Sequence, residues 1–179
     1  DQIKVDLAYS NIKVTMTGLA SGLINGPLGN THCCIEDVGA LRSIPNLTIV
    51  SPADGVGIVK TVFASAESDK PIYIRLTGGS NNPIVYHEDI NFQIGKAIEI
   101  ETGKDLTIFA TGTMVFNSLQ AAKILSEKGI HTSVWDMHTI KPIDEVAIKE
   151  AVNKNKLIVT VEEHNIFGGL SSAVSEHLS

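Results

Sequence analysis

The chain has 179 residues, of which 43% are hydrophobic and 19% are charged, and its formal net charge is −6 at pH 7. This balance predicts a soluble globular protein with a buried core, and an acidic chain lacks the basic stripe by which proteins bind nucleic acid. No run of about 18 uncharged apolar residues occurs, so the sequence predicts no membrane-spanning helix.

The first part of the chain begins with a helix and a strand. Ile3 and Leu7 lie four residues apart, which indicates a helix over residues 1–9. No capping signal precedes this helix, so we expect a first domain that is truncated. Residues 12–17 alternate β-branched and other side chains, which predicts a strand. The glycine-rich loop 18–29 is expected to move or to lie close to a ligand.

Residues 29–46 predict a short helix with one buried stripe, formed by Ile35, Val38 and Leu41. Pro45 ends this helix because proline cannot continue it. His32 is then expected at the helix N-terminus, at the lip of the loop, where an imidazole can exchange a hydrogen bond with a substrate hydroxyl. The alternative is a surface histidine that only caps the helix.

The two cysteines, Cys33 and Cys34, are neighbours in the sequence. An ordinary disulfide between adjacent residues would be strained, and two thiols do not complete a tetrahedral zinc site. We therefore expect free thiols in a reducing compartment, the cytoplasm.

Two strands and one helix are expected between positions 47 and 77. Residues 47–50 and 71–76 are apolar and β-branched, and Asp54 can cap a helix between them. The apolar stripe of this helix consists of Val56, Val59, Phe63 and Ala66. Strands that alternate with helices predict a parallel α/β sheet, in which ligands lie beyond the carboxyl ends of the strands.

Arg75 is a charged residue within an apolar strand. Arginine is rarely buried without a partner, so it either forms a structural ion pair, for which Asp54 is a candidate, or serves a ligand.

Residues 78–94 are rich in Gly, Asn, Ser and Pro and predict a linker at a domain boundary. Beyond it, residues 95–179 predict a three-layer α/β domain. The expected strands are 97–100, 106–110, 132–136 and 157–161, and the expected helices are 115–128, 144–154 and a last one after Gly169. In this domain Glu162, Glu163 and His164 are too few for a metal site and predict an interface network, whereas His138 and Lys141 are expected to shape a loop.

Several short motifs occur in the same order as in the transketolase family, and the chain resembles that family through them. They are Thr31-His32, Glu36-Asp37, Leu41-Arg42, Ile44-Pro45-Asn46, Ser51-Pro52-Ala53-Asp54, Glu162-Glu163-His164 and Phe167-Gly168-Gly169. By this resemblance, residues 1–77 are the second half of the pyrimidine-binding domain, 78–94 a linker, and 95–179 the transketolase C-terminal domain.

The resemblance implies an enzyme that moves a two-carbon ketol unit between sugar phosphates. It implies thiamine diphosphate with Mg²⁺ or Ca²⁺ as the cofactor of the full assembly. His32 would contact the hydroxyls of the donor sugar, and Arg75 would clamp the substrate phosphate. The expected partners are an N-terminal transketolase section or subunit and, in a homodimer, a second copy.

Departures from the family leave alternatives open. Relatives carry an acidic residue just before the glycine of the Thr-His motif, where this chain has Leu28. The glutamate that activates the cofactor and the aromatic residues that stack on its pyrimidine ring lie upstream of Asp1 in the family, so the chain alone is expected to bind no cofactor and to be inactive. The alternatives are a non-catalytic assembly or regulatory module, a 1-deoxyxylulose-5-phosphate synthase, or a 2-oxo acid dehydrogenase beta subunit.

Overall fold

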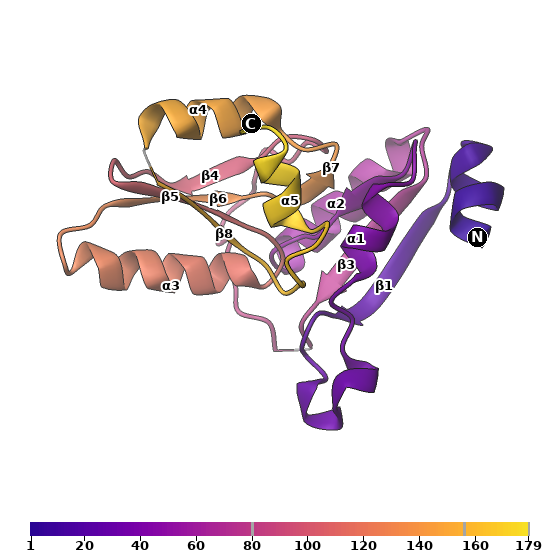
Figure 1. The fold of residues 1–179 in the computed structure, drawn as a ribbon, viewed down its shortest axis with the longest axis horizontal. Coiled ribbons are helices and arrows are strands. Elements are labelled where there is room, and N and C mark those ends of the chain that lie inside the picture. The colour runs from indigo at the N-terminus through magenta and orange to yellow at the C-terminus, as the bar shows by residue number, and fades with distance from the viewer. Residues whose placement is uncertain (80, 156, 179) are drawn as a thin grey trace.

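In the computed structural model, which describes residues 1–79, 81–155 and 157–178, the chain forms two four-stranded sheets with helices against them (Figure 1). The α/β fold expected from the alternation of strands and helices is therefore confirmed. Among the described residues, no helix has the length and apolar character needed to cross a bilayer.

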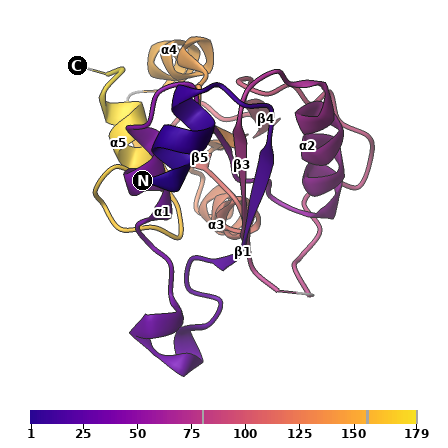
Figure 2. The ribbon, with the colours of Figure 1, turned by 90° about the vertical axis from the view of Figure 1, so that its right-hand side faces the viewer.

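The first sheet has the strand order β1-β3-β2-β7. Its strands are β1 (Thr15–Ser21), β3 (Ile72–Thr77), β2 (Thr48–Val50) and β7 (Thr139–Lys141). The first three are parallel, and β1 pairs with β3 from Thr15 opposite Ile72 to Gly18 opposite Arg75. Figure 2 shows α1 (Asp37–Arg42) and α2 (Gly55–Glu67) on opposite faces of this sheet.

Strand β7 joins the first sheet although it lies late in the chain. It runs antiparallel to β2, with Val50 opposite Thr139 and Ile49 opposite Lys141. The Lys141 ammonium donates to the carbonyl of Arg42 at 2.8 Å and also to that of Ile44, at the end of α1. The expected loop is present at His138, between β6 and β7, but Lys141 was wrongly placed in it, because Thr139–Lys141 of the second half complete the sheet of the first.

Strand β1 continues farther than the sequence predicted. The glycine-rich loop was expected to begin at Gly18, but pairing with β3 carries the strand through Gly18 to Ser21. A Cβ atom at Gly18 would lie 2.2 Å from the Tyr73 hydroxyl. The glycine is therefore needed to accommodate the Tyr73 side chain and does not form a turn.

Helix α2 presents Val59 and Phe63 of the expected apolar stripe outward, whereas Val56 is half-buried and packs against the core. Asp54 caps it as expected, accepting a hydrogen bond from the Gly57 amide at 3.0 Å. However, Phe63 is 71% exposed and Val59 is 54% exposed, whereas small or hydroxylated residues, Gly57, Thr61 and Ser65, face inward. The Thr61 hydroxyl donates to the Gly57 carbonyl at 2.7 Å, so this buried hydroxyl is satisfied within the helix itself.

The second sheet has the strand order β4-β6-β5-β8. Its strands are β4 (Ile98–Glu101), β6 (Thr132–Asp136), β5 (Leu106–Ala110) and β8 (Ile158–Val161), and its helices are α3 (Met114–Ser126), α4 (Glu145–Lys154) and α5 (Leu170–Ser175). Figure 1 shows α3 and α4 on opposite sides of this sheet, which gives the three layers expected.

The two halves share part of their core. One cluster of buried side chains combines Val38, Leu47, Ile49 and Tyr73 of the first half with Ile140 and Ala173 of the second. The position of the first sheet therefore depends on residues from both halves of the chain.

Candidate functional site

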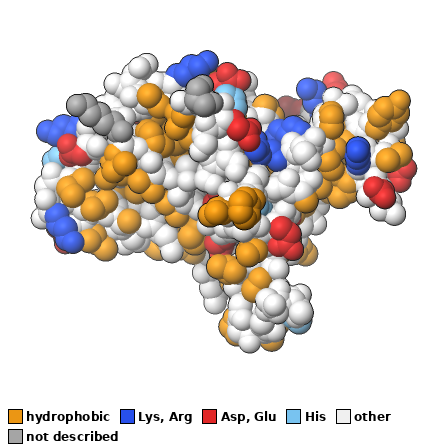
Figure 3. All heavy atoms as spheres, viewed as in Figure 1, with side chains coloured by type: hydrophobic (Ala, Val, Ile, Leu, Met, Phe, Trp, Pro, Cys, Tyr) orange, Lys and Arg blue, Asp and Glu red, His pale blue; other side chains and the backbone are white. Residues whose placement is uncertain are grey.

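The loop that carries His32 projects from the protein, and its two ends are hydrogen-bonded to each other. We define the arm as residues 22–34, which stand off the body of the protein in Figures 1 and 3. Gly22 and Cys34 form an antiparallel bridge, which we call the neck of the arm: the Gly22 amide donates to the Cys34 carbonyl at 2.8 Å, and the Cys34 amide to the Gly22 carbonyl at 3.0 Å. Leu23, Ile24 and Leu28 expose apolar surface on it.

His32 is exposed, as a residue that contacts substrate must be, but it does not begin the helix. It ends a single 3₁₀ turn, Asn30–His32, and α1 starts five residues later at Asp37. Its Nδ1 lies 3.0 Å from the Thr31 hydroxyl. The expected helix N-terminus at His32 was wrong because Cys33 is extended and Cys34 pairs with Gly22. The role of His32 stays a prediction.

Arg75 lies inside the protein, 1% exposed, beneath the neck of the arm. Its Nε atom lies 2.8 and 3.1 Å from the two carboxylate oxygens of Asp37. Its Nη2 atom donates to the carbonyls of Cys34 at 3.2 Å and Glu163 at 2.8 Å. The ion-pair partner considered from the sequence, Asp54, was wrong; the partner is Asp37. This geometry favours a structural role, and phosphate binding by Arg75 stays a prediction.

The Asp37 carboxylate also changes the acidity of its neighbours. The Tyr73 hydroxyl donates to it at 2.9 Å, and burial together with this carboxylate raises the pKa of Tyr73 to about 12. Burial and the charge of Asp37 raise the pKa of the Cys34 thiol. Both groups therefore hold their protons near pH 7, and the pair Asp37–Arg75 is the charged centre under the neck.

A loop from the C-terminal half lies against the arm. We call residues 162–169 the tail loop. The Glu163 carboxylate accepts from the Leu23 amide at 3.4 Å and from the Thr113 hydroxyl at 2.7 Å. Asn165 donates to the Ile35 carbonyl through its backbone amide at 2.9 Å and its side chain at 2.7 Å. Glu163 thus contacts the start of the arm, and Asn165 contacts Ile35, the residue that follows its end.

Two further residues of the tail loop have separate partners. The His164 Nε2 atom accepts from the Gly39 amide at 3.2 Å, in α1. Glu162 instead accepts from the amides of Leu170 and Ser171 at the start of α5. The interface network expected of this motif is present for Glu163 and His164, whereas Glu162 serves its own half of the chain. No local pattern indicated the contact between Glu163 and the arm, because residues 23 and 163 are far apart in the chain.

The linker is fastened by two buried carboxylates. Asp54 accepts from the amides of Val85 and Tyr86, each at 2.8 Å, and the Tyr86 hydroxyl donates to Asp136 at 2.7 Å. Burial, with the charge of Asp54 nearby, raises the pKa of Asp136 to about 7. Burial lowers the pKa of His138, which stacks on Phe92, to about 4.

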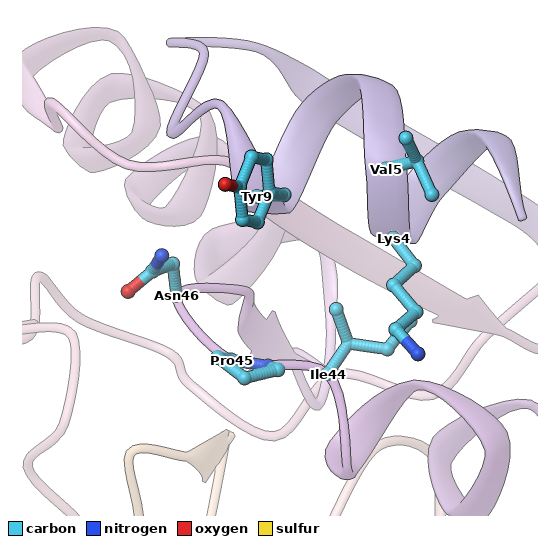
Figure 4. Close-up of a pocket in the computed structure, with 6 residues that line it drawn as sticks. All are labelled: Lys4, Val5, Tyr9, Ile44, Pro45 and Asn46. Carbon is cyan, nitrogen blue, oxygen red and sulfur yellow. The ribbon is translucent and has the colours of Figure 1, made fainter.

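The most apolar of the hollows described lies away from the arm. It has a volume of about 370 Å³ and is lined by Lys4, Val5, Tyr9, Ile44, Pro45 and Asn46. Figure 4 shows residues of the first helical segment, Ile3–Tyr9, across from the turn that follows α1. It contains none of the chemistry-bearing residues discussed above, so we assign no site to it. Nearer the arm, a shallow cleft of about 400 Å³ separates the start of α1 from Asn165 and Phe167 of the tail loop.

Among the described residues, no three His, Cys, Asp or Glu side chains are grouped so that they could hold a metal ion. The resemblance attributes the cofactor and its metal ion to the full assembly, and no residue of this chain is assigned to either.

Comparison with known proteins finds two matching family models. "Transketolase, pyrimidine binding domain" matches residues 1–82, and "Transketolase, C-terminal domain" matches residues 95–179. An apulose-4-phosphate transketolase subunit of Phocaeicola vulgatus is 43% identical over all of this chain, which covers 57% of that protein. A putative transketolase C-terminal section of Methanocaldococcus jannaschii is 38% identical over 95% of the chain and 53% of its own length.

A solved structure agrees with these relatives. The chain resembles a structure titled as a split gene transketolase, an inactive beta4 tetramer, with a TM-score of 0.91 and 37% identity over 99% of this chain and 57% of the other. The chain thus spans about half the length of the curated relatives that it matches. It belongs to the transketolase family, and its residues correspond to the pyrimidine-binding and C-terminal domains of that family.

Proposed function

We propose that this chain is the C-terminal part of a transketolase assembled from two polypeptides, which transfers a two-carbon ketol unit between sugar phosphates. The observation that carries the proposal is the match over the whole chain, at 43% identity, to a protein described as a transketolase subunit. In this proposal residues 1–77 belong to the pyrimidine-binding domain, 78–94 form the linker, and 95–179 form the C-terminal domain.

The proposed role of the chain is to bind and orient the donor sugar. His32 is exposed on the arm, so its imidazole is free to reach a hydroxyl of a sugar held against the arm. Arg75 and Asp37 neutralise each other beneath the neck and fix the Cys34 carbonyl, two residues from His32. We also propose that Arg75 contributes to binding the substrate phosphate. This role requires the buried guanidinium to become accessible in the assembly.

The cofactor belongs to the assembly in this proposal. Thiamine diphosphate, held with Mg²⁺ or Ca²⁺, supplies the carbanion chemistry that breaks and remakes the carbon–carbon bond. The partner is an N-terminal transketolase section, and we propose that two such pairs form a dimer in the cytoplasm, where Cys33 and Cys34 remain free thiols.

The test is reconstitution with the N-terminal section of a split transketolase from the same source. With thiamine diphosphate, Mg²⁺, a ketose phosphate donor and an aldose phosphate acceptor, turnover is expected from the mixture and not from either polypeptide alone. Turnover by this chain alone, or none from a mixture that forms a stable complex, would contradict the proposal. Replacing the aldose phosphate by glyceraldehyde 3-phosphate with pyruvate distinguishes ketol transfer from deoxyxylulose phosphate synthesis.

A further inference from the structure

The tail loop is hydrogen-bonded to the arm at Leu23 and, through Arg75, at Cys34, although the two segments belong to different halves of the chain. We propose that the tail loop is the positioning element of the His32 arm and that Glu163 is its principal side chain. The effect on catalysis rests on the proposed function. The effect on the arm itself can be measured by hydrogen–deuterium exchange, which requires no enzyme activity.

At the first end of the neck, Glu163 meets the arm through its side chain. One carboxylate oxygen accepts from the Leu23 amide at 3.4 Å, and the other accepts from the Thr113 hydroxyl at 2.7 Å. Thr113 is itself fixed to the first sheet, since its amide donates to the Thr77 hydroxyl at 3.1 Å. The carboxylate therefore joins the arm to a point where the two halves already meet.

At the second end, the backbone of the tail loop carries the contact. The Glu163 carbonyl accepts from Arg75 at 2.8 Å, and the same Arg75 nitrogen donates to the Cys34 carbonyl at 3.2 Å. Two residues farther on, Asn165 donates twice to the Ile35 carbonyl. The guanidinium thus bridges the tail loop and the arm directly, and a displacement of one segment displaces the other.

The tail loop packs closely against the arm at Gly22. Gly22 has a φ of +80°, which disfavours a residue with a side chain. A Cβ atom placed there would lie 2.9 Å from the Cβ of Glu163. The neck is therefore built to fit closely against Glu163, as a positioning contact requires.

The position of His32 follows from these contacts. His32 is two residues from Cys34, and its ring contacts Thr31 of the same arm. Among the described residues, no hydrogen bond joins its side chain to the body of the protein, so its place is set through the neck. The C-terminal domain would then act on donor binding without a side chain that touches the donor.

Hydrogen–deuterium exchange of the full chain tests the positioning. Glu163→Ala is expected to speed exchange in peptides spanning residues 22–34 about tenfold, because Leu23 loses a charged acceptor and Gly22 its packing partner. Glu163→Gln keeps an acceptor and should restore most of the protection, and Thr113→Val should give an intermediate increase. Glu150→Ala serves as the matched control, since Glu150 lies on the exposed face of α4 and pairs only with Lys154 among the contacts described.

Unchanged exchange of the arm in Glu163→Ala would overturn the proposal, as would an equal increase in strands β5 and β6, which would mean general destabilisation. In the reconstituted assembly, Glu163→Ala should lower kcat/KM for the donor about tenfold and Glu163→Gln should rescue it. If the wild-type assembly transfers no ketol unit, the proposed function fails while the exchange result still decides the positioning. If wild type is active and Glu163→Ala matches it, the positioning has no catalytic consequence and the inference fails.

Discussion

Replacing Arg75 with methionine is expected to lower the free energy of unfolding by about 3–5 kcal/mol, because the substitution leaves the Asp37 carboxylate buried without its cation. The carbonyls of Cys34 and Glu163 lose their donor at the same time. Urea denaturation monitored by two probes measures the change.

A double variant separates the ion pair from the loss of packing. Asp37→Asn in the Arg75→Met background should recover part of the lost stability, since no unpaired charge then remains buried. Stability close to wild type in Arg75→Met, together with weaker binding of a ketose phosphate by the assembly, would instead show that Arg75 serves the substrate phosphate and not the fold.

Replacing Asp136 with asparagine is expected to change how stability depends on pH. In the folded protein the pKa of Asp136 is about 7, against an ordinary value of 3.8. The folded state therefore keeps a proton that the unfolded state loses above pH 4, so this group's contribution to stability falls as the pH rises from about 4 to 7. One pKa unit corresponds to about 1.4 kcal/mol, so a difference of about three units changes the free energy of unfolding by about 4 kcal/mol across this pH range.

His138 acts in the opposite direction, and this makes the variant informative. Its pKa is about 4 in the fold against 6.5 ordinarily, so its contribution is present above pH 6.5 and is lost as the pH falls toward 4. The two contributions oppose each other between pH 4 and 6.5 in the wild type. In Asp136→Asn the opposing contribution of Asp136 is gone while that of His138 remains, and stability should rise over that interval and then level off.

Urea denaturation of both proteins at pH 4.5, 5.5, 6.5 and 7.5 checks this expectation. The stability of Asp136→Asn relative to wild type should increase steadily with pH. A difference between the two proteins that is the same at every pH would mean that Asp136 is ionised in the fold and would contradict the account.

The sequence predicted most strands and helices because their signals are local. Strands 106–110 and 132–136 were predicted with the bounds that the structure has, and Asp54 and Asp144 cap helices as capping residues should. Strand β7 was missed because three residues carry no periodicity, and its pairing with β2 depends on how the two halves pack. Long-range pairing also extended β1 through Gly18, against the low strand preference of glycine.

Helix α2 shows where an apolar period misleads. The spacing of Val59 and Phe63 predicts a stripe, but it does not say which side the stripe faces. In the fold, the buried residues of this helix are Gly57, Thr61 and Ser65, whereas Val59 and Phe63 are exposed. The buried face therefore consists of small or hydroxylated residues, which an apolar period does not reveal.

The candidate site was predicted only in part. The sequence singled out His32, which is exposed on the arm, and Arg75, whose burial in an apolar strand demanded a partner. It did not reveal that the partner is Asp37 or that Glu163 reaches the arm, because both contacts join residues far apart in the chain. The first contact follows from the tertiary packing of the first half of the chain and the second from the docking of the two halves, and no local pattern encodes either.

The most direct test of the account is the activity of His32→Ala in the assembly reconstituted with its N-terminal section. We expect kcat/KM for the donor ketose to fall about 100-fold, the usual cost of removing one hydrogen-bonding group that acts on the reacting substrate. The free energy of unfolding should stay that of wild type, since His32 is exposed and its described side-chain contact is with Thr31. A kcat/KM equal to that of wild type would show that the arm has no part in donor recognition and would contradict the account.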